Sequence, residues 1–210
     1  LTNFPDKLYM FICGMEARTE NERLTLSRVN GNPTIGVGFD LVAGDEPVRK
    51  AVLEGMGFHP DDGNNNNDVI HAQAIENDYA DRLKRLMEAH VTDVSQYNQI
   101  LLERRNNTDP AYAALVPVDS RRTEFRFYSD AEVRSVFDSL WISVYRNRVL
   151  NLLPAGSGSN TALTESKEII VLASLGGNNA DLIGPSLREA IRQGNRAEAW
   201  FEIRYRSNDP

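Results

Sequence analysis

The sequence predicts an α+β fold that is mainly helical and carries one small β-hairpin near the N-terminus. Most segments place apolar residues three and four positions apart, which is the spacing of an amphipathic helix. A single stretch alternates instead and turns at Asn30-Gly31-Asn32. The length of 210 residues fits one domain. We therefore expect a single domain over 1–210, with a hairpin lobe at about 19–45 and a helical body elsewhere.

Composition excludes several classes of protein. The chain has 23 Lys and Arg against 30 Asp and Glu, a formal charge of −7 and 41% hydrophobic residues, which is close to the globular average. The acidic balance argues against nucleic-acid binding, and no run approaches the length of a membrane span. The only cysteine, Cys13, cannot form an internal disulfide and is expected in the core of a helical apolar face.

The N-terminal half contains the predicted hairpin. We expect a first helix at about 6–18 with Leu8, Phe11, Ile12 and Met15 on its apolar face. The strands are expected at 23–29 and 34–39, because Asn and Gly tolerate the positive φ of a tight turn.

Everything after the hairpin is predicted to be helical. Amphipathic segments are expected at 48–56, 69–88, 91–102, 129–145, 165–175, 185–193 and 195–205. Ser129 with Glu132, and Asn195 with Glu198, have the spacing of helix-capping pairs. Gly176-Gly177 and Gly194 are expected to end the helices that precede them.

Glu16 is the first candidate for chemistry. An acid at a helix end, followed by a Gly-rich hairpin, places a carboxyl group where sheet and helices meet. Glycoside hydrolysis needs such an acid to protonate the leaving oxygen, and a second polar group to hold water. The alternative is a solvated helix-end Glu without a catalytic role.

Two runs of residues form a recognisable pattern. The first is Ile12-x-x-x-Glu16-Ala17, followed by Thr34-Ile35-Gly36-Val37-Gly38 in the hairpin and then Phe39-Asp40-Leu41. The second comprises an apolar helix at 169–175 with the turn Gly176-Gly177-Asn178, and the closing helix at 195–205. These runs resemble the phage-type lysozymes, and the ending Phe39-Asp40-Leu41 resembles that of the pesticin-like muramidases. The resemblance implies a lysozyme-like fold and leaves about 42–161 uncovered.

The resemblance also implies roles for individual residues. Glu16 takes the general-acid position, Thr34 helps to place the hydrolytic water, and Asp40 matches the second acid of the pesticin-like variant. Asn178 and Arg204 are implied to bind substrate. The implied activity is hydrolysis of peptidoglycan glycan strands, and no cofactor is implied.

The hairpin departs from the phage pattern at one position. Arg28 stands where the phage enzymes carry an Asp ahead of the signature Thr. Because of this departure, Asp40 becomes the main candidate for the second carboxylate, and Glu20 and Glu22 remain alternatives to Glu16 as the general acid. Asp40 has a structural alternative, because an Asp after a strand often caps the next turn, and Thr34 has one as a strand residue.

Other residues give weaker indications of metal binding or sugar binding. The tract Asp61–Asp68 fails the spacing of an EF-hand, and His59, His71 and His90 lack zinc-ligand spacing, so we expect no metal. Trp141 and Trp200 are able to stack on sugars but are expected in the core.

The functional expectation is a muramidase that serves as a bacteriolytic toxin or effector. The chain begins at Leu1 without a signal peptide and resembles a piece of a longer protein, so we expect delivery to the bacterial periplasm or the extracellular space. A delivery apparatus and an immunity protein are the partners this would require. The alternatives are a catalytically weak peptidoglycan-binding or adaptor module, for which Arg28 is the best support, and hydrolysis of chitin or chitosan.

Overall fold

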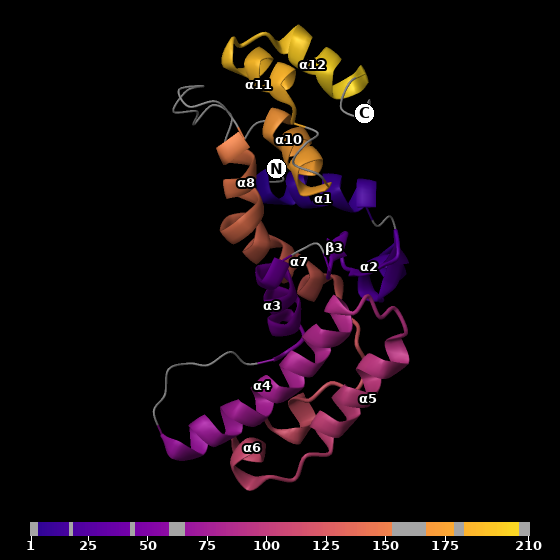
Figure 1. Cartoon of the computed structure of the whole chain (residues 1–210), viewed down its shortest axis with the longest axis vertical. Helices are drawn as coiled ribbons and strands as arrows, with labels where there is room; N and C mark the ends of the chain where they lie inside the picture. Colours follow the sequence, from indigo (N-terminus) through magenta and orange to yellow (C-terminus); the bar gives the residue numbers. More distant parts are fainter. Residues whose placement is uncertain are drawn as a thin grey trace. The chain divides into compact units, whose positions relative to one another are not determined.

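The computed structural model describes residues 4–16, 19–42, 45–58, 66–152, 167–178 and 183–205. This part is mostly helical and holds a three-stranded antiparallel sheet, which confirms a mainly helical α+β fold (Figure 1). Its elements are α1 (Phe4–Glu16), α2 (Glu20–Leu24), β1 (Ser27–Val29), β2 (Asn32–Ile35), β3 (Phe39–Asp40), α3 (Asp45–Gly55), α4 (Asn67–Glu88), α5 (Val94–Arg105), α6 (Pro110–Leu115), the 3₁₀ turn η1 (Val118–Ser120), α7 (Asp130–Leu140), the π-helical turn η2 (Trp141–Tyr145), α8 (Arg146–Leu152), α10 (Lys167–Asn178), α11 (Pro185–Arg192) and α12 (Arg196–Tyr205).

The chain forms two compact units. One unit comprises Cys13–Phe137, which includes the sheet and helices α2 to α6. The other comprises Leu1–Ile12 and Asp138–Pro210. Helices α1 and α7 each contribute residues to both units.

The sheet has the strand order β1-β2-β3. Val29 pairs with Asn32, so Asn30-Gly31 is a two-residue turn, and both of its residues have positive φ, at 52° and 91°. That is the geometry of a type I′ hairpin turn, as the sequence predicts.

The second arm of the predicted hairpin is not one strand. We expect a continuous strand over 34–39, and this is wrong: β2 ends at Ile35 and β3 returns antiparallel to it from Phe39. The reversal uses Gly36 and Gly38, at φ 70° and 84°, which residues with a side chain rarely adopt. A Cβ on Gly36 would also lie 2.5 Å from the ring of Phe39.

The first predicted arm is shorter than expected. Its beginning is helical, because Thr19 and Glu22 form a reciprocal capping box that starts α2. The guanidinium of Arg23 in α2 donates two hydrogen bonds to Asp130 at the start of α7, at 2.6 and 2.9 Å. The hairpin is thereby tied to α7 within one unit.

Helix α1 ends at Glu16, close to the predicted end of the first helix. Leu8 and Ile12 are buried as expected, and Tyr9 joins them. Phe11 and Met15 were also expected on the buried face, but they are 38% and 61% exposed. The buried stripe is therefore rotated toward Tyr9.

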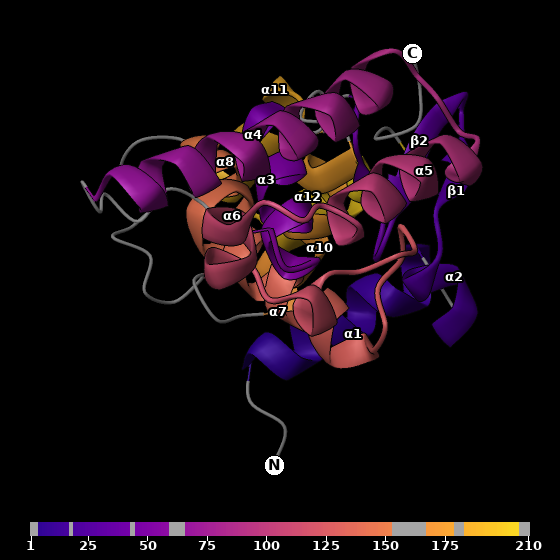
Figure 2. The ribbon, with the colours of Figure 1, turned by 90° about the horizontal axis from the view of Figure 1, so that it is seen from below.

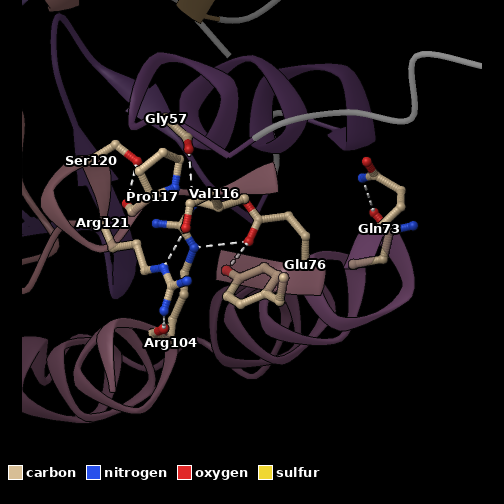
Figure 3. Close-up of polar contacts among 10 residues, drawn as sticks. Gly57, Gln73, Glu76, Arg104, Val116, Pro117, Ser120 and Arg121 are labelled. Carbon is tan, nitrogen blue, oxygen red and sulfur yellow. Dashed lines mark hydrogen bonds and ion pairs between the residues drawn. The ribbon is translucent and has the colours of Figure 1, made fainter. Parts of the chain in front are cut away.

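Within the uncovered middle of the chain, helices α4 to α6 form an assembly in the unit that contains the sheet. Helix α4 packs against both α5 and α6 (Figures 1 and 2). Its centre is polar: Arg104, 0% exposed, donates to both oxygens of Glu76 at 2.6 and 2.9 Å, and the Tyr112 hydroxyl donates to the same carboxylate (Figure 3). Burial alone would lower the pKa of Arg104, but the Glu76 carboxylate outweighs it and raises that pKa.

The remaining unit contains the C-terminal helices. Helix α8 packs against α10, and α11 against α12. Gly194 has φ 68° between α11 and α12, and the Asn195 side chain accepts a hydrogen bond from the Glu198 amide, which confirms this predicted helix stop and start. The predicted stop at Gly176-Gly177 is wrong, because α10 continues to Asn178. No helix in the described ranges is long and apolar enough to span a membrane.

Candidate functional site

Glu16 lies against the glycine turn of the sheet. It is the last residue of α1 and is exposed. A Cβ built on Gly38 would lie 3.3 Å from the Glu16 carboxylate oxygen Oε2 and 3.4 Å from its Cγ. A side chain on Gly38 would therefore displace the carboxyl group of Glu16. The structure thus brings the first predicted site residue to the turn between β2 and β3.

Thr34 and Asp40 face each other across those two strands. They are direct partners in the β2–β3 register, so their side chains project from the same face of the sheet. Thr34 is 7% exposed, and its hydroxyl donates to the Asn32 carbonyl at 3.4 Å. The two residues predicted to hold water are therefore neighbours.

Asp40 has hydrogen bonds on both carboxylate oxygens. Oδ1 accepts from the Val42 amide at 2.8 Å, and Oδ2 accepts from Nδ2 of Asn32 at 2.8 Å. The Val42 contact is the turn-capping role that the sequence leaves open as an alternative. Each oxygen of a carboxylate accepts more than one hydrogen bond, so these contacts leave Asp40 able to bind water as well.

Asn32 and His90 belong to this site, although sequence reasoning gave neither a role in it. The Asn32 side chain bridges Asp40 and His90, whose Nδ1 lies 2.9 Å from Asn32 Oδ1. His90 follows α4, in the middle region that the family resemblance leaves uncovered. The sequence signal for His90 is its position two residues after a predicted helix end, where glycine is the usual residue.

The rival acids have other environments. Glu22 accepts the Thr19 amide as part of the capping box of α2, so its carboxylate has a structural role. Glu20 is exposed in the first turn of the same helix. Arg28, at the position of the missing phage-type Asp, is exposed on β1. Of the three acids Glu16, Glu20 and Glu22, Glu16 is the one shown here against the glycine turn.

The residues implied to bind substrate lie in the other unit. Asn178 is the last residue of α10, and its side chain is outside what the structure describes. Arg204 is exposed on α12. Trp141 is buried as expected, whereas the expectation of a buried Trp200 is wrong, because that side chain is 57% exposed on α12.

Groups that could hold a metal are absent from the described part of the chain. No cluster of three or more His, Cys, Asp or Glu side chains occurs there. Residues 59–65, which include His59 and most of the Asp- and Asn-rich tract, lie outside that part. Asn66 and Asp68, from the end of the tract, form the N-cap and first turn of α4. Cys13 is half-buried near the end of α1.

Searches of protein-family models, of curated proteins and of solved structures find no match to this chain. The features that bear on function are therefore the positions of Glu16, Thr34 and Asp40. In chemical terms, that geometry combines an exposed carboxyl group with a hydroxyl and a carboxylate from one sheet face. One group able to donate a proton and two able to position water are the groups that glycoside hydrolysis requires.

Proposed function

We propose that this chain is a muramidase with a lysozyme-like fold, which hydrolyses the glycan strands of bacterial peptidoglycan. The observation that carries the proposal is the contact between the end of α1 and the sheet: the Glu16 carboxylate lies against Gly38, in the turn that joins the strands of Thr34 and Asp40. This is the arrangement that the resemblance to phage-type and pesticin-like enzymes implies.

In the proposed mechanism, Glu16 is the general acid. It protonates the glycosidic oxygen as the bond to the anomeric carbon breaks, so that the leaving sugar departs as a neutral alcohol. Exposure of Glu16 leaves it accessible to a bound polymer. General acid catalysis contributes roughly 10²–10⁴-fold to such reactions.

Asp40 and Thr34 act on the water in this mechanism. The Asp40 carboxylate accepts the proton of a water that attacks the anomeric carbon, and the Thr34 hydroxyl helps to orient it. Val42 and Asn32 hold both oxygens of Asp40, so the carboxylate is fixed before substrate binds. No cofactor takes part in these steps.

Peptidoglycan as the substrate places the site of action in the periplasm or outside the cell. A delivery apparatus, and an immunity protein in the producing cell, are the partners that a lytic toxin of this kind requires. These assignments follow from the proposed substrate and are part of the same proposal.

A second candidate is a peptidoglycan-binding or adaptor module with the same fold and little activity. Arg28 favours it, since a cation occupies the position of the phage-type acid and is exposed on β1. Binding to sacculi without release of any sugar would distinguish this module from an enzyme.

The test is the release of reducing ends from purified sacculi by the wild type, Glu16→Gln and Glu22→Gln. Glu16→Gln keeps the shape of the side chain but cannot donate the proton, so we expect at least a hundredfold loss of rate with retained binding to sacculi. Glu22→Gln is the control, because it changes an acid that lies six residues further along the chain and caps α2. An inactive wild type that still binds sacculi would favour the adaptor, and equal rates for Glu16→Gln and wild type would remove Glu16 from the mechanism.

A further inference from the structure

A polar chain of three side chains connects the end of α4 to the sheet. His90 Nδ1 lies 2.9 Å from Asn32 Oδ1, and Asn32 Nδ2 lies 2.8 Å from Asp40 Oδ2. All three residues belong to the unit Cys13–Phe137. The chain therefore joins a residue outside the lysozyme-like signature to one within it.

The direction of these hydrogen bonds is determined by their chemistry. A carboxylate accepts and does not donate, so the Asn32 amide presents its NH₂ group to Asp40 and its oxygen to His90. His90 must then donate from Nδ1. Since a neutral imidazole carries one proton, the neutral ring is fixed with the proton on Nδ1 and a lone pair on Nε2.

The backbone at His90 shows why a histidine here is informative. Helix α4 ends in a Schellman motif: the His90 amide donates to the Met87 carbonyl, and the Val91 amide donates to the Leu86 carbonyl, both at 3.0 Å. His90 occupies the left-handed position of that motif, with φ 56°. Glycine is the usual residue there because it has no Cβ. A histidine at this position is less stable in the left-handed conformation than glycine, but its side chain reaches Asn32.

Asn32 connects to both water-holding groups. Its side chain contacts Asp40, and its carbonyl accepts the Thr34 hydroxyl at 3.4 Å. Asn32 and Thr34 are two residues apart on β2, so they share a face of the sheet with Asp40, the partner of Thr34. Rotation of the Asn32 amide would therefore change the orientation of the Asp40 carboxylate.

We propose that Asn32 and His90 are positioning residues for Asp40, an inference that rests on the proposed muramidase function. His90 fixes the orientation of the Asn32 amide, and Asn32 fixes the plane of the Asp40 carboxylate, so that the carboxylate is held in one orientation toward the attacking water. The helical middle of the chain thus takes part in positioning water through the residue that follows α4.

The test compares His90→Gly with His71→Ala and Asn32→Ala. His90→Gly removes the imidazole and suits the left-handed backbone, so we expect an unchanged or higher melting temperature with a tenfold to hundredfold lower kcat and little change in KM on soluble glycan fragments. Asn32→Ala should lower kcat by at least as much. His71→Ala is the matched control, because His71 is also an exposed histidine that contacts a carboxylate, here that of Asp109, the N-cap of α6. This variant should keep the wild-type kcat.

A second readout does not depend on activity. Nitrogen NMR of labelled histidine should show neutral His90 protonated on Nδ1 in the wild type, and this preference should be lost in Asn32→Ala. Wild-type kcat in both His90→Gly and Asn32→Ala, or a neutral His90 protonated on Nε2, would overturn the positioning role. If the wild type does not cleave sacculi at all, the muramidase proposal fails, while the NMR result still decides whether the chain of hydrogen bonds exists.

Discussion

Gly38 is the residue on which the position of Glu16 depends. Its φ of 84° suits glycine, and a Cβ at this position would make a tight contact, 3.3 Å, with the Glu16 carboxylate oxygen Oε2. The glycine therefore serves both the reversal of the chain and the placement of the acid. Gly36 serves mainly the reversal, since its nearest neighbour is the ring of Phe39.

Gly38→Ala should lower activity by more than its effect on stability explains. A left-handed alanine costs about 1–2 kcal/mol, and its methyl group would also push against the Glu16 carboxylate. Gly57→Ala is the control, because Gly57 has nearly the same φ, 82°, and open space around it. Rates on sacculi together with urea unfolding distinguish the two effects. Equal activity in the two variants, at equal loss of stability, would show that Gly38 acts through the backbone alone.

At the scale of single residues, a local motif predicts which groups lie near one another, while the catalytic roles of Glu16, Thr34 and Asp40 stay predictions. Thr34 and Asp40 are six residues apart, and the turn at Gly36–Gly38 makes them partners across β2 and β3. Glu16 lies 18 residues before Thr34, and its side chain is next to Gly38 of the same turn. The contact between Asn32 and His90 could not be predicted, because the two residues are 58 positions apart in the sequence. It depends on where the end of α4 lies relative to the sheet. Trp200 was assigned to the core from helical spacing, which does not reveal how much of a helix its neighbours cover.

At the scale of elements, the helices of the middle region are held by a buried ion pair. Arg104 and Glu76 are fully buried and joined by two hydrogen bonds, while Gly57 and Tyr112 supply further partners (Figure 3). The guanidinium also lies 4.2 Å from the ring centroid of Phe58. The network joins α4, α5 and α6 to the residues after α3.

Arg104→Met should destabilise the chain by about 3–5 kcal/mol, because it leaves the Glu76 carboxylate buried without its cation. The double variant with Glu76→Leu should lose clearly less than the sum of the two single losses. Urea unfolding monitored by circular dichroism measures all three. Additive losses would mean that the pair does not act as a unit.

Helix caps in the same region make stability depend on pH. The Tyr112 amide donates to the Asp109 carboxylate, and His71 lies 3.0 Å from it; together they hold the pKa of Asp109 below its usual 3.8. Because the folded pKa is lowered, this contribution to stability is present above pH 3.8 and is lost as the pH falls through the folded pKa.

Asp109→Asn should therefore reduce the acid sensitivity of the fold. Asparagine still caps α6 but does not titrate, so its melting temperature should fall less than that of the wild type between about pH 6 and about pH 3. Thermal melts across this range provide the measurement. Parallel curves for the two proteins would assign the acid sensitivity to other carboxylates, such as Glu46, whose pKa is also lowered.

The ends of helices were predicted correctly where local capping residues set them, and wrongly where contacts with the rest of the fold set them. Asn195 and Gly194 set the start of α12 and the end of α11 as expected. The pair Gly176-Gly177 did not end α10, since glycine tolerates a helical backbone and only lowers its stability. The short α6 and η1 lie in a stretch without clear apolar periodicity and were not predicted.

At the scale of the whole molecule, the net charge is −7. Peptidoglycan-bearing envelopes are largely anionic, so long-range attraction does not bring this protein to its proposed substrate. Recognition must then depend on short-range contacts at the site or on a delivery partner. The sequence alone supports this conclusion, since it depends on composition and not on the fold.

Activity on sacculi should not fall when salt is raised from about 0.05 M to about 0.3 M, because screening weakens a repulsion instead of an attraction. A cationic lysozyme measured in parallel should lose rate over the same range. A steep loss for this protein would indicate a local basic surface that governs binding.

The central claim is that water, positioned by Asp40 and Thr34, replaces the leaving sugar. The most direct measurement is mass spectrometry of the fragments released from sacculi in heavy-oxygen water, by the wild type and by Glu16→Gln. We expect wild-type fragments whose new reducing end is muramic acid carrying one heavy oxygen atom, and almost none from Glu16→Gln. Fragments that end in an anhydro sugar without heavy oxygen, or equal yields from both proteins, would contradict it.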